Sequence, residues 1–186
     1  MLNTQGNQQL RNTLQQIIDN NREGKVSIQI TLIESLSTIL PHTIRLEEEA
    51  KLNNDKSWQY NCFTYAFRLW ESPEFVDINE HFSFLLPNSS FVSYLIAGHL
   101  TQTVQDDVKD DDYIIYFLND EPQHAGRIRK DKIVSKWGMY HLWEHGIWEI
   151  PIQYGDRVCF FEQISIEECV SAFKTWVDAD DMVAYK

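Results

Sequence analysis

The stretch YIIYFLNDEPQHAGRIRKDKIVSKWG at residues 113–138 decides the fold class of this chain. It opens with YIIYFL at 113–118, a continuous apolar run that is typical of a central β-strand. Turn residues follow at 119–122, and the segments 124–129 and 133–138 predict two further strands. Strands joined by such short turns pair as antiparallel neighbours, so we expect an antiparallel sheet.

The segments on either side of this stretch predict an α+β fold. Further strands are expected at 147–152 and 157–163. Helices are expected at 7–22, at 62–70, from Ser89 or Ser90 to Thr101, and after Ser165, which caps its helix together with Glu168. The segment 26–39 fits a strand in its first half and a helix in its second. This order, in which helices come first, the strands of the sheet follow and a helix closes the chain, favours an α+β fold.

Length and composition predict one main domain. The chain has 186 residues, of which 43% are hydrophobic and 24% charged, as in globular proteins. The first helix carries only a narrow apolar stripe, formed by Leu10, Leu14, Ile17 and Ile18. We therefore expect a helical appendage at 1–25 and a single domain at 26–186.

The charge of the chain excludes some classes of partner. The formal net charge is −12, which disfavours nucleic acid and an anionic membrane surface but suits a basic protein partner. Three cysteines do not form a disulfide framework, and neither a signal peptide nor an apolar span of about 18 residues is visible. A cytoplasmic protein is expected, and its oligomeric state is not determined by the sequence.

Cys62 and His124 are the candidate catalytic residues. Asn61 is a strong N-cap, so Cys62 is placed in the first turn of a helix. There the helix dipole and free N–H groups favour a thiolate and an oxyanion. His124 begins a strand before the small pair Ala125–Gly126 and is the candidate general base. Each residue alone also fits a structural role, as a small core cysteine or a half-exposed histidine.

Three motifs in this order resemble the papain-like cysteine amidase and peptidase superfamily, and its NlpC-type branch in particular. They are NCFTYAF at 61–67, HAGRI at 124–128 and VSKWG at 134–138. The later WEH at 143–145 and QYGD at 153–156 make the order similar to an uncharacterised bacterial family of that fold. The resemblance covers residues 58–161 and leaves the N-terminal helices and the final helix outside.

The resemblance implies a papain-like core in which a helix bearing Cys62 packs on an antiparallel sheet bearing His124. A third polar group would orient the imidazole of His124. His145 is the first choice for this role, with Ser135 and Glu144 as alternatives, because Lys136 cannot accept a hydrogen bond. Gln59 is the candidate donor to the oxyanion.

The function expected from these residues is that of a cysteine hydrolase or acyltransferase acting on a peptide, amide or ester carbonyl. Two alternatives stay open: a catalytically inactive papain-like binding or regulatory module, and a partner-dependent protein of the toxin or neutraliser type. No cofactor is expected. No metal site is expected either, because His141 and His145 are placed in a loop and lack the spacing of known zinc sites. The sequence does not specify the substrate.

Overall fold

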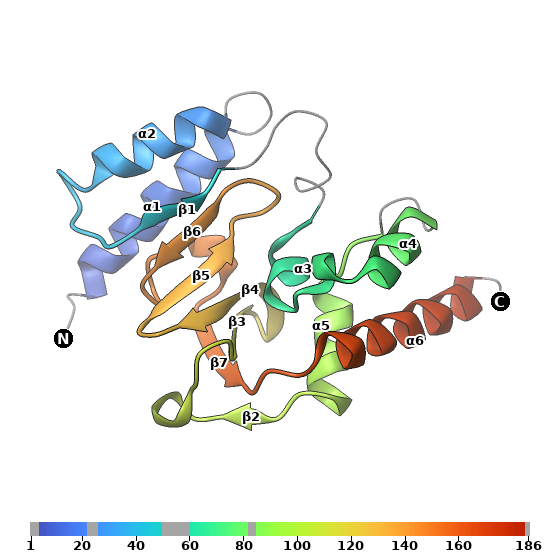
Figure 1. Cartoon of the computed structure of the whole chain (residues 1–186). Coiled ribbons are helices and arrows are strands. Elements are labelled where there is room, and N and C mark those ends of the chain that lie inside the picture. Colours follow the sequence, from blue (N-terminus) through green and yellow to red (C-terminus); the bar gives the residue numbers. More distant parts are fainter. Residues whose placement is uncertain (1–3, 22–25, 50–59, 82–84, 185–186) are drawn as a thin grey trace.

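The computed structural model describes residues 4–21, 26–49, 60–81 and 85–184. Within these residues the chain is an α+β fold built on one antiparallel sheet of seven strands (Figure 1). The strand order is β1-β6-β5-β4-β3-β7-β2. The strands are β1 (Arg45–Glu48), β2 (Gln102–Thr103), β3 (Tyr113–Leu118), β4 (Glu121–Arg129), β5 (Lys132–Lys136), β6 (Leu142–His145) and β7 (Arg157–Phe161).

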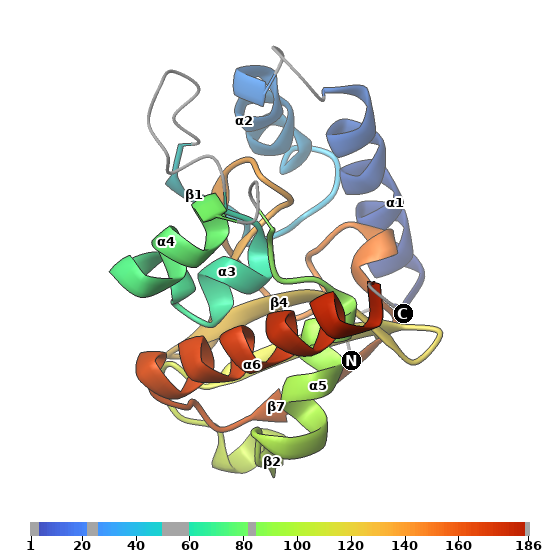
Figure 2. The same cartoon turned by 90° about the vertical axis from the view of Figure 1, so that its right-hand side faces the viewer.

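Helices cover both faces of this sheet. The α-helices are α1 (Thr4–Asn20), α2 (Val26–Leu36), α3 (Cys62–Ala66), α4 (Pro73–His81), α5 (Ser89–Gly98) and α6 (Ile166–Ala184). Short 3₁₀ turns are η2 (Leu69–Glu71), η3 (Gln105–Asp107) and η4 (Ile152–Tyr154). Figures 1 and 2 show α1 and α2 on one side of the sheet and α3, α4, α5 and α6 on the other.

The central strand β3 contributes to two separate hydrophobic cores. Tyr113, Ile115 and Phe117 pack with the helices of the α3–α6 side, whereas Ile114 and Tyr116 pack with those of the α1–α2 side. Side chains alternate between the faces of a strand, so a strand covered on both faces has no polar positions. This explains the continuous apolar run by which the strand is recognised in the sequence.

The apolar stripe of α1 belongs to the second of these cores. Leu10, Leu14, Ile17 and Ile18 are all buried and share a cluster with Tyr116. Arg11 strengthens the attachment, because its guanidinium donates hydrogen bonds to the carbonyl oxygens of residues 150, 152 and 155. The helix thus covers a sheet face that would otherwise be exposed. That residues 1–25 form an independent appendage stays a prediction.

The helix expected at 62–70 is shorter in the structure. It ends at Ala66 with Phe67 as its C-cap, and Arg68 adopts a left-handed conformation with φ 56° before the 3₁₀ turn η2 begins. The change of direction moves Trp70 out of the core. Its side chain is 46% exposed, and its ring stacks on that of Tyr60 at a centroid distance of 5.8 Å.

Other element assignments also differ from those expected. The strand predicted at 147–152 is wrong, because Glu149 closes a turn there: its backbone N–H donates to the Gly146 carbonyl and its carboxylate accepts from the Gly146 N–H. The strand lies earlier, at β6, and includes His145. The ambiguous segment 26–39 contains the helix α2, and α4 was not predicted from the sequence.

Candidate functional site

Asn61 places Cys62 at the start of α3, as its side chain predicts. The Asn61 Oδ1 accepts a hydrogen bond from the backbone N–H of Thr64 at 3.0 Å, which is the N-cap interaction. Its Nδ2 donates to the carbonyl oxygen of Pro87 at 2.7 Å, which ties the start of the helix to the segment before α5. Cys62 is therefore held at a fixed point against the sheet.

The sulfur of Cys62 lies where strands β4 and β5 separate. The ladder between them ends at the pair Arg127 and Val134. Alternate residues of β4 direct their N–H groups to β5, so the N–H of Ala125 has no strand partner beyond that point. It donates instead to the Cys62 sulfur, which takes the position of a missing strand carbonyl. The nucleophile candidate thus contacts the residue that follows His124.

Burial raises the pKa of the Cys62 thiol to about 11. The backbone N–H groups of Ala125, Phe63 and Cys62 act in the opposite direction, as expected at a helix start, but they do not overcome the loss of solvation. Cys62 is only 7% exposed. The resting group is therefore a thiol, and the thiolate expected from the helix start is not favoured.

His124 is fully buried among aromatic rings and one hydroxyl. Its ring stacks on Tyr154 at a centroid distance of 4.1 Å, and Tyr116 lies against it at 5.6 Å. The Nε2 atom lies 2.9 Å from the Ser135 hydroxyl oxygen. Gly126 leaves room for this contact, because a Cβ there would lie 3.0 Å from the Cβ of Ser135. Burial, with a smaller effect of His145, holds the pKa of His124 well below its usual value.

Ser135 connects His124 to His145 in a buried chain of hydrogen bonds. The Ser135 hydroxyl lies 2.7 Å from the Nε2 of His145, whose Nδ1 lies 2.8 Å from the carbonyl oxygen of Gly146. A carbonyl oxygen only accepts, so the Nδ1 of His145 carries the hydrogen. Burial lowers the pKa of His145 to about 4, so its ring is neutral and Nε2 accepts from the serine.

The same logic determines the tautomer of His124. Because the Ser135 hydroxyl donates to His145, its oxygen accepts from the Nε2–H of His124. The neutral ring then has a bare Nδ1. This atom is buried and has no hydrogen-bond partner among the described residues. Ser135 thus contacts the imidazole directly, and His145 acts through it.

Cys62 packs against β4 on the α3–α6 side, whereas the side chain of His124, a residue of β4, leaves that strand on the α1–α2 side. The register pairs His124 with Tyr116, a residue of the α1–α2 side, whereas Cys62 and Ala125 belong to the core of the α3–α6 side. Their closest connection in the described residues is the Ala125 peptide, and no hydrogen bond joins the sulfur to the imidazole there. The described conformation therefore places Cys62 and the His124 ring on opposite faces of the sheet, and they do not face each other across an open groove.

The remaining candidates lie elsewhere. Glu144 is paired with Val134 on the α3–α6 side of the sheet, so it is separated from His124 and lines a surface pocket with Arg45 and Arg129. Gln59 lies outside the described residues. Glu144 takes no part in the hydrogen bonds that join Ser135 to His124 and His145.

Sequence reasoning missed the role of Lys136. It follows Ser135 on β5 and points to the opposite face, where its side chain is 2% exposed and its Nζ lies 4.1 Å from the ring centroid of Tyr60. Burial lowers its pKa to about 8. The available signal was the pair Ser135–Lys136, which directly follows the apolar Ile133 and Val134 in β5.

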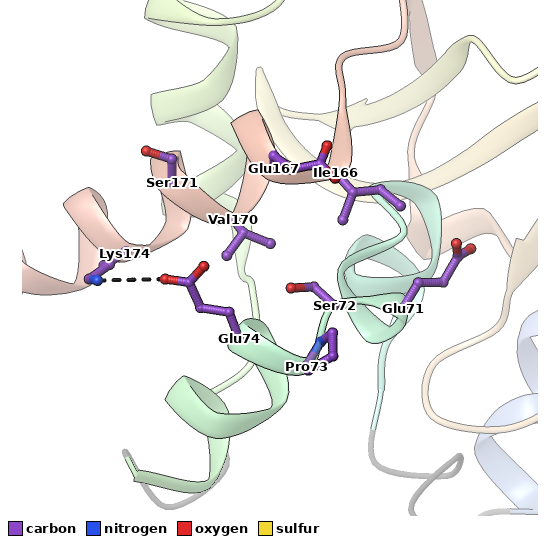
Figure 3. Close-up of a pocket in the computed structure, with 9 residues that line it drawn as sticks. All are labelled: Glu71, Ser72, Pro73, Glu74, Ile166, Glu167, Val170, Ser171 and Lys174. Carbon is purple, nitrogen blue, oxygen red and sulfur yellow. Dashed lines mark ion pairs between the residues drawn. The ribbon is translucent and has the colours of Figure 1, made fainter.

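A pocket of about 380 Å³ lies away from these residues, between η2, α4 and α6 (Figure 3). Its walls are held by an ion pair of 3.6 Å between Lys174 of α6 and Glu74 of α4. Ile166 and Val170 form its apolar side. It contains no residue of the Cys62, His124 and Ser135 group, so it is a feature of the surface rather than of the candidate site.

Fold and site together define an α+β domain with a cysteine at a helix start on one face of an antiparallel sheet and a buried His–Ser–His chain on the other face. The model of a domain of unknown function, DUF7689, matches residues 51–162, and the chain belongs to that family. The matched segment includes Cys62, His124, Ser135, Lys136 and His145. No curated protein and no solved structure matches the chain. No helix within the described ranges is long and apolar enough to cross a membrane.

Proposed function

We propose that the protein is a papain-like cysteine hydrolase or acyltransferase that acts on an amide or ester carbonyl, with Cys62 as nucleophile and His124 as general base. The observation that supports this most strongly is the directional chain from Gly146 through His145 and Ser135. It leaves His124 with a bare, unpartnered Nδ1 one residue from the contact of the Cys62 sulfur.

In the proposed reaction the proton of the Cys62 thiol passes to Nδ1 of His124 while the sulfur attacks the carbonyl carbon. The backbone N–H groups of Cys62 and Ala125 lie against the sulfur and are available to the developing oxyanion. The imidazolium keeps its Nε2–H on Ser135, then returns the Nδ1 proton to the leaving group. Water, or another nucleophile in an acyl transfer, releases the acyl group from the sulfur.

The pKa values favour general-base catalysis over a preformed ion pair. The thiol pKa is raised to about 11 and the imidazole pKa is lowered, so both groups are neutral at rest. Proton transfer then accompanies attack on the substrate. The hydrogen bond between a catalytic thiol and its base is often long without substrate and shortens in the complex. In the described conformation β4 separates the Cys62 sulfur from the His124 ring, so the proposed proton transfer requires a rearrangement of β4 when the substrate binds.

A binding or regulatory module without turnover is the second candidate. It is favoured by the burial of both Cys62 and His124, at 7% and 0% exposure. In that case the histidine chain would stabilise the sheet and the thiol would fill the gap between β4 and β5.

Acetylation by p-nitrophenyl acetate distinguishes these two functions. For the hydrolase we expect an acetyl group on Cys62, located by peptide mass spectrometry, and continued release of nitrophenol. Cys62→Ala abolishes both, and His124→Ala slows acetylation by about 100-fold, the usual contribution of a general base. His42→Ala is the control, because its ring nitrogens contact only the backbone at Ile33 and Ile44. Acetylation that is equal in the parent and His124→Ala would reject the proposed function.

A further inference from the structure

Lys136 lies beside the candidate nucleophile. In the register of β4 and β5 it is the position opposite Ala125, just beyond the last ladder pair of Arg127 and Val134. Ala125 is the residue whose N–H contacts the Cys62 sulfur. The Lys136 side chain leaves β5 on the face that α3 covers, and its ammonium reaches the ring of Tyr60, two residues before Cys62.

Among the described residues, the ammonium of Lys136 has an incomplete set of partners. Its Nζ donates to the carbonyl oxygen of Tyr140 at 2.6 Å and lies over the Tyr60 ring. An ammonium has three N–H donors, and the described residues supply one acceptor and one aromatic face. No described carboxylate forms an ion pair with it, although Glu48 acts on its charge from a greater distance. A buried cation without a counterion is costly unless an anion binds to it.

A row of aromatic rings leads from the surface to this ammonium. Trp70 is 46% exposed, and its ring stacks on Tyr60 with an interplanar angle of 15°. Tyr60 in turn lies 4.1 Å from the Lys136 Nζ. The row therefore combines an exposed apolar surface, a buried ring and a cation, all adjoining the start of α3.

We propose that Lys136 binds a carboxylate of the substrate, and that Tyr60 and Trp70 form the aromatic surface along which the ligand lies. That the ligand is a substrate rests on the proposed function. Binding of a carboxylate at Lys136 does not itself require catalysis. The expected substrate is then an acyl compound with a free carboxylate near the reacting carbonyl, such as a peptide that presents its terminal carboxylate. Lys136 is thus a residue that determines specificity.

Thermal unfolding with a matched pair of small molecules tests this site. Phenylacetate carries the aromatic ring and the carboxylate, whereas phenylacetamide has the same shape without the charge. A ligand that binds only the native state raises its melting temperature. We expect phenylacetate to raise it and phenylacetamide to have little effect, with affinity for the acid about tenfold higher, as for a charge-assisted hydrogen bond.

Lys136→Met keeps the length of the side chain and should abolish the preference for phenylacetate. Lys174→Met is the control, because it removes the same charge from a side chain that is 59% exposed on α6. Loss of the preference in Lys136→Met alone supports the site. Equal stabilisation by acid and amide in the parent, or an unchanged preference in Lys136→Met, overturns it.

A second readout separates this inference from the proposed function. His124→Ala removes the general base but leaves Lys136 in place, so it should lose turnover of p-nitrophenyl acetate and keep the preference for phenylacetate. A chain that binds phenylacetate through Lys136 yet never acetylates Cys62 retains the carboxylate site and rejects the hydrolase. A chain that acetylates Cys62 without any preference for the acid retains the hydrolase and rejects the carboxylate site.

Discussion

The Nε2 of His124 lies 2.9 Å from the hydroxyl oxygen of Ser135, and this contact determines which nitrogen of the imidazole carries its hydrogen. Ser135 already donates its own hydrogen to His145, so it can only accept from His124. The carbonyl of Gly146 thus determines the tautomer of His145, and through Ser135 it also determines the tautomer of His124. The predictions below follow from this chain and from the cores on either side of it.

Ser135→Ala should reduce both stability and catalysis. The change leaves the Nε2–H of His124 without an acceptor and the Nε2 of His145 without a donor, which costs about 1–3 kcal/mol of unfolding free energy for such buried groups. Ester turnover should fall by about 100-fold, because the tautomer of His124 is no longer selected. Denaturant unfolding and nitrophenol release measure the two effects. Ser93→Ala, at an exposed serine of α5, is the control, and full turnover in Ser135→Ala would exclude an orienting role.

His145 should make the protein less stable as the pH falls from about 6.5 to 4. Its pKa in the folded state is about 4, below the 6.5 of an unfolded chain, so the unfolded state binds more protons between these values. The contribution of His145 to the free energy of unfolding is fully present above pH 6.5. It is lost as the pH falls toward 4, at up to about 1.4 kcal/mol per pH unit. His145→Gln keeps an acceptor for Ser135 and should flatten this dependence in denaturant titrations. Parallel curves for the parent and His145→Gln would show that His145 is not a buried neutral ring.

Leu14→Ala should destabilise the whole fold. Leu14 is fully buried between α1 and the sheet, and truncation of such a side chain costs about 2–5 kcal/mol. Leu32→Ala on α2, where the residue is 37% exposed, should cost much less. Chemical denaturation of both variants compares the two sites. If Leu14→Ala has the stability of the parent, α1 is an independent appendage and the boundary expected at residue 25 holds.

Lys136→Met should stabilise the protein at neutral pH, because it removes a buried charge that has no counterion in the described residues. The pKa of Lys136 is about 8 in the folded chain and about 10.4 when unfolded, so the unfolded state binds more protons between these values. The buried thiols of Cys62 and Cys169, whose pKa values are raised to about 11 and 12, lower the stability of both proteins over this range, because they ionise first in the unfolded state. The difference between the two proteins isolates Lys136: relative to Lys136→Met, the parent should gain stability from pH 8 to about pH 9.5. A difference that does not change from pH 8 to pH 9.5 would contradict this assignment.

Iodoacetamide should modify Cys159 before Cys62, although p-nitrophenyl acetate should acylate Cys62. Cys159 is partly exposed on β7, whereas Cys62 and Cys169 are buried with thiol pKa values raised to about 11 and 12. Simple alkylation follows access and thiolate population, whereas acylation with turnover requires the base. Mass spectrometry of peptides after limited reaction shows which cysteine each reagent modifies first. First alkylation at Cys62 would mean that its thiol is more accessible and more acidic than the structure indicates.

The sequence alone determined those features that depend on neighbouring residues in the chain. The run at 113–118 is apolar because both faces of β3 are covered, and Asn61 and Ser165 cap the helices that follow them, as expected. The antiparallel order of β3, β4, β5 and β6 follows from the short connections between them, whereas the places of β1, β2 and β7 in the sheet do not. The NCFTYAF, HAGRI and VSKWG motifs contain Cys62, His124 and Ser135, the candidate residues of the site. Local propensity and turn chemistry depend on a few neighbouring residues, so they can be predicted from the sequence.

Only the tertiary structure decided how those residues interact. The run IWEIPI at 147–152 suggested a strand, but Glu149 hydrogen-bonds to Gly146 and forms a turn. The strand is β6 instead, and it brings His145 to Ser135. Burial decided that Cys62 is a thiol rather than a thiolate, and strand register decided that it contacts Ala125 rather than the His124 ring. Solvation and hydrogen-bond direction depend on which distant segments cover a group, and the sequence around the group does not contain that information.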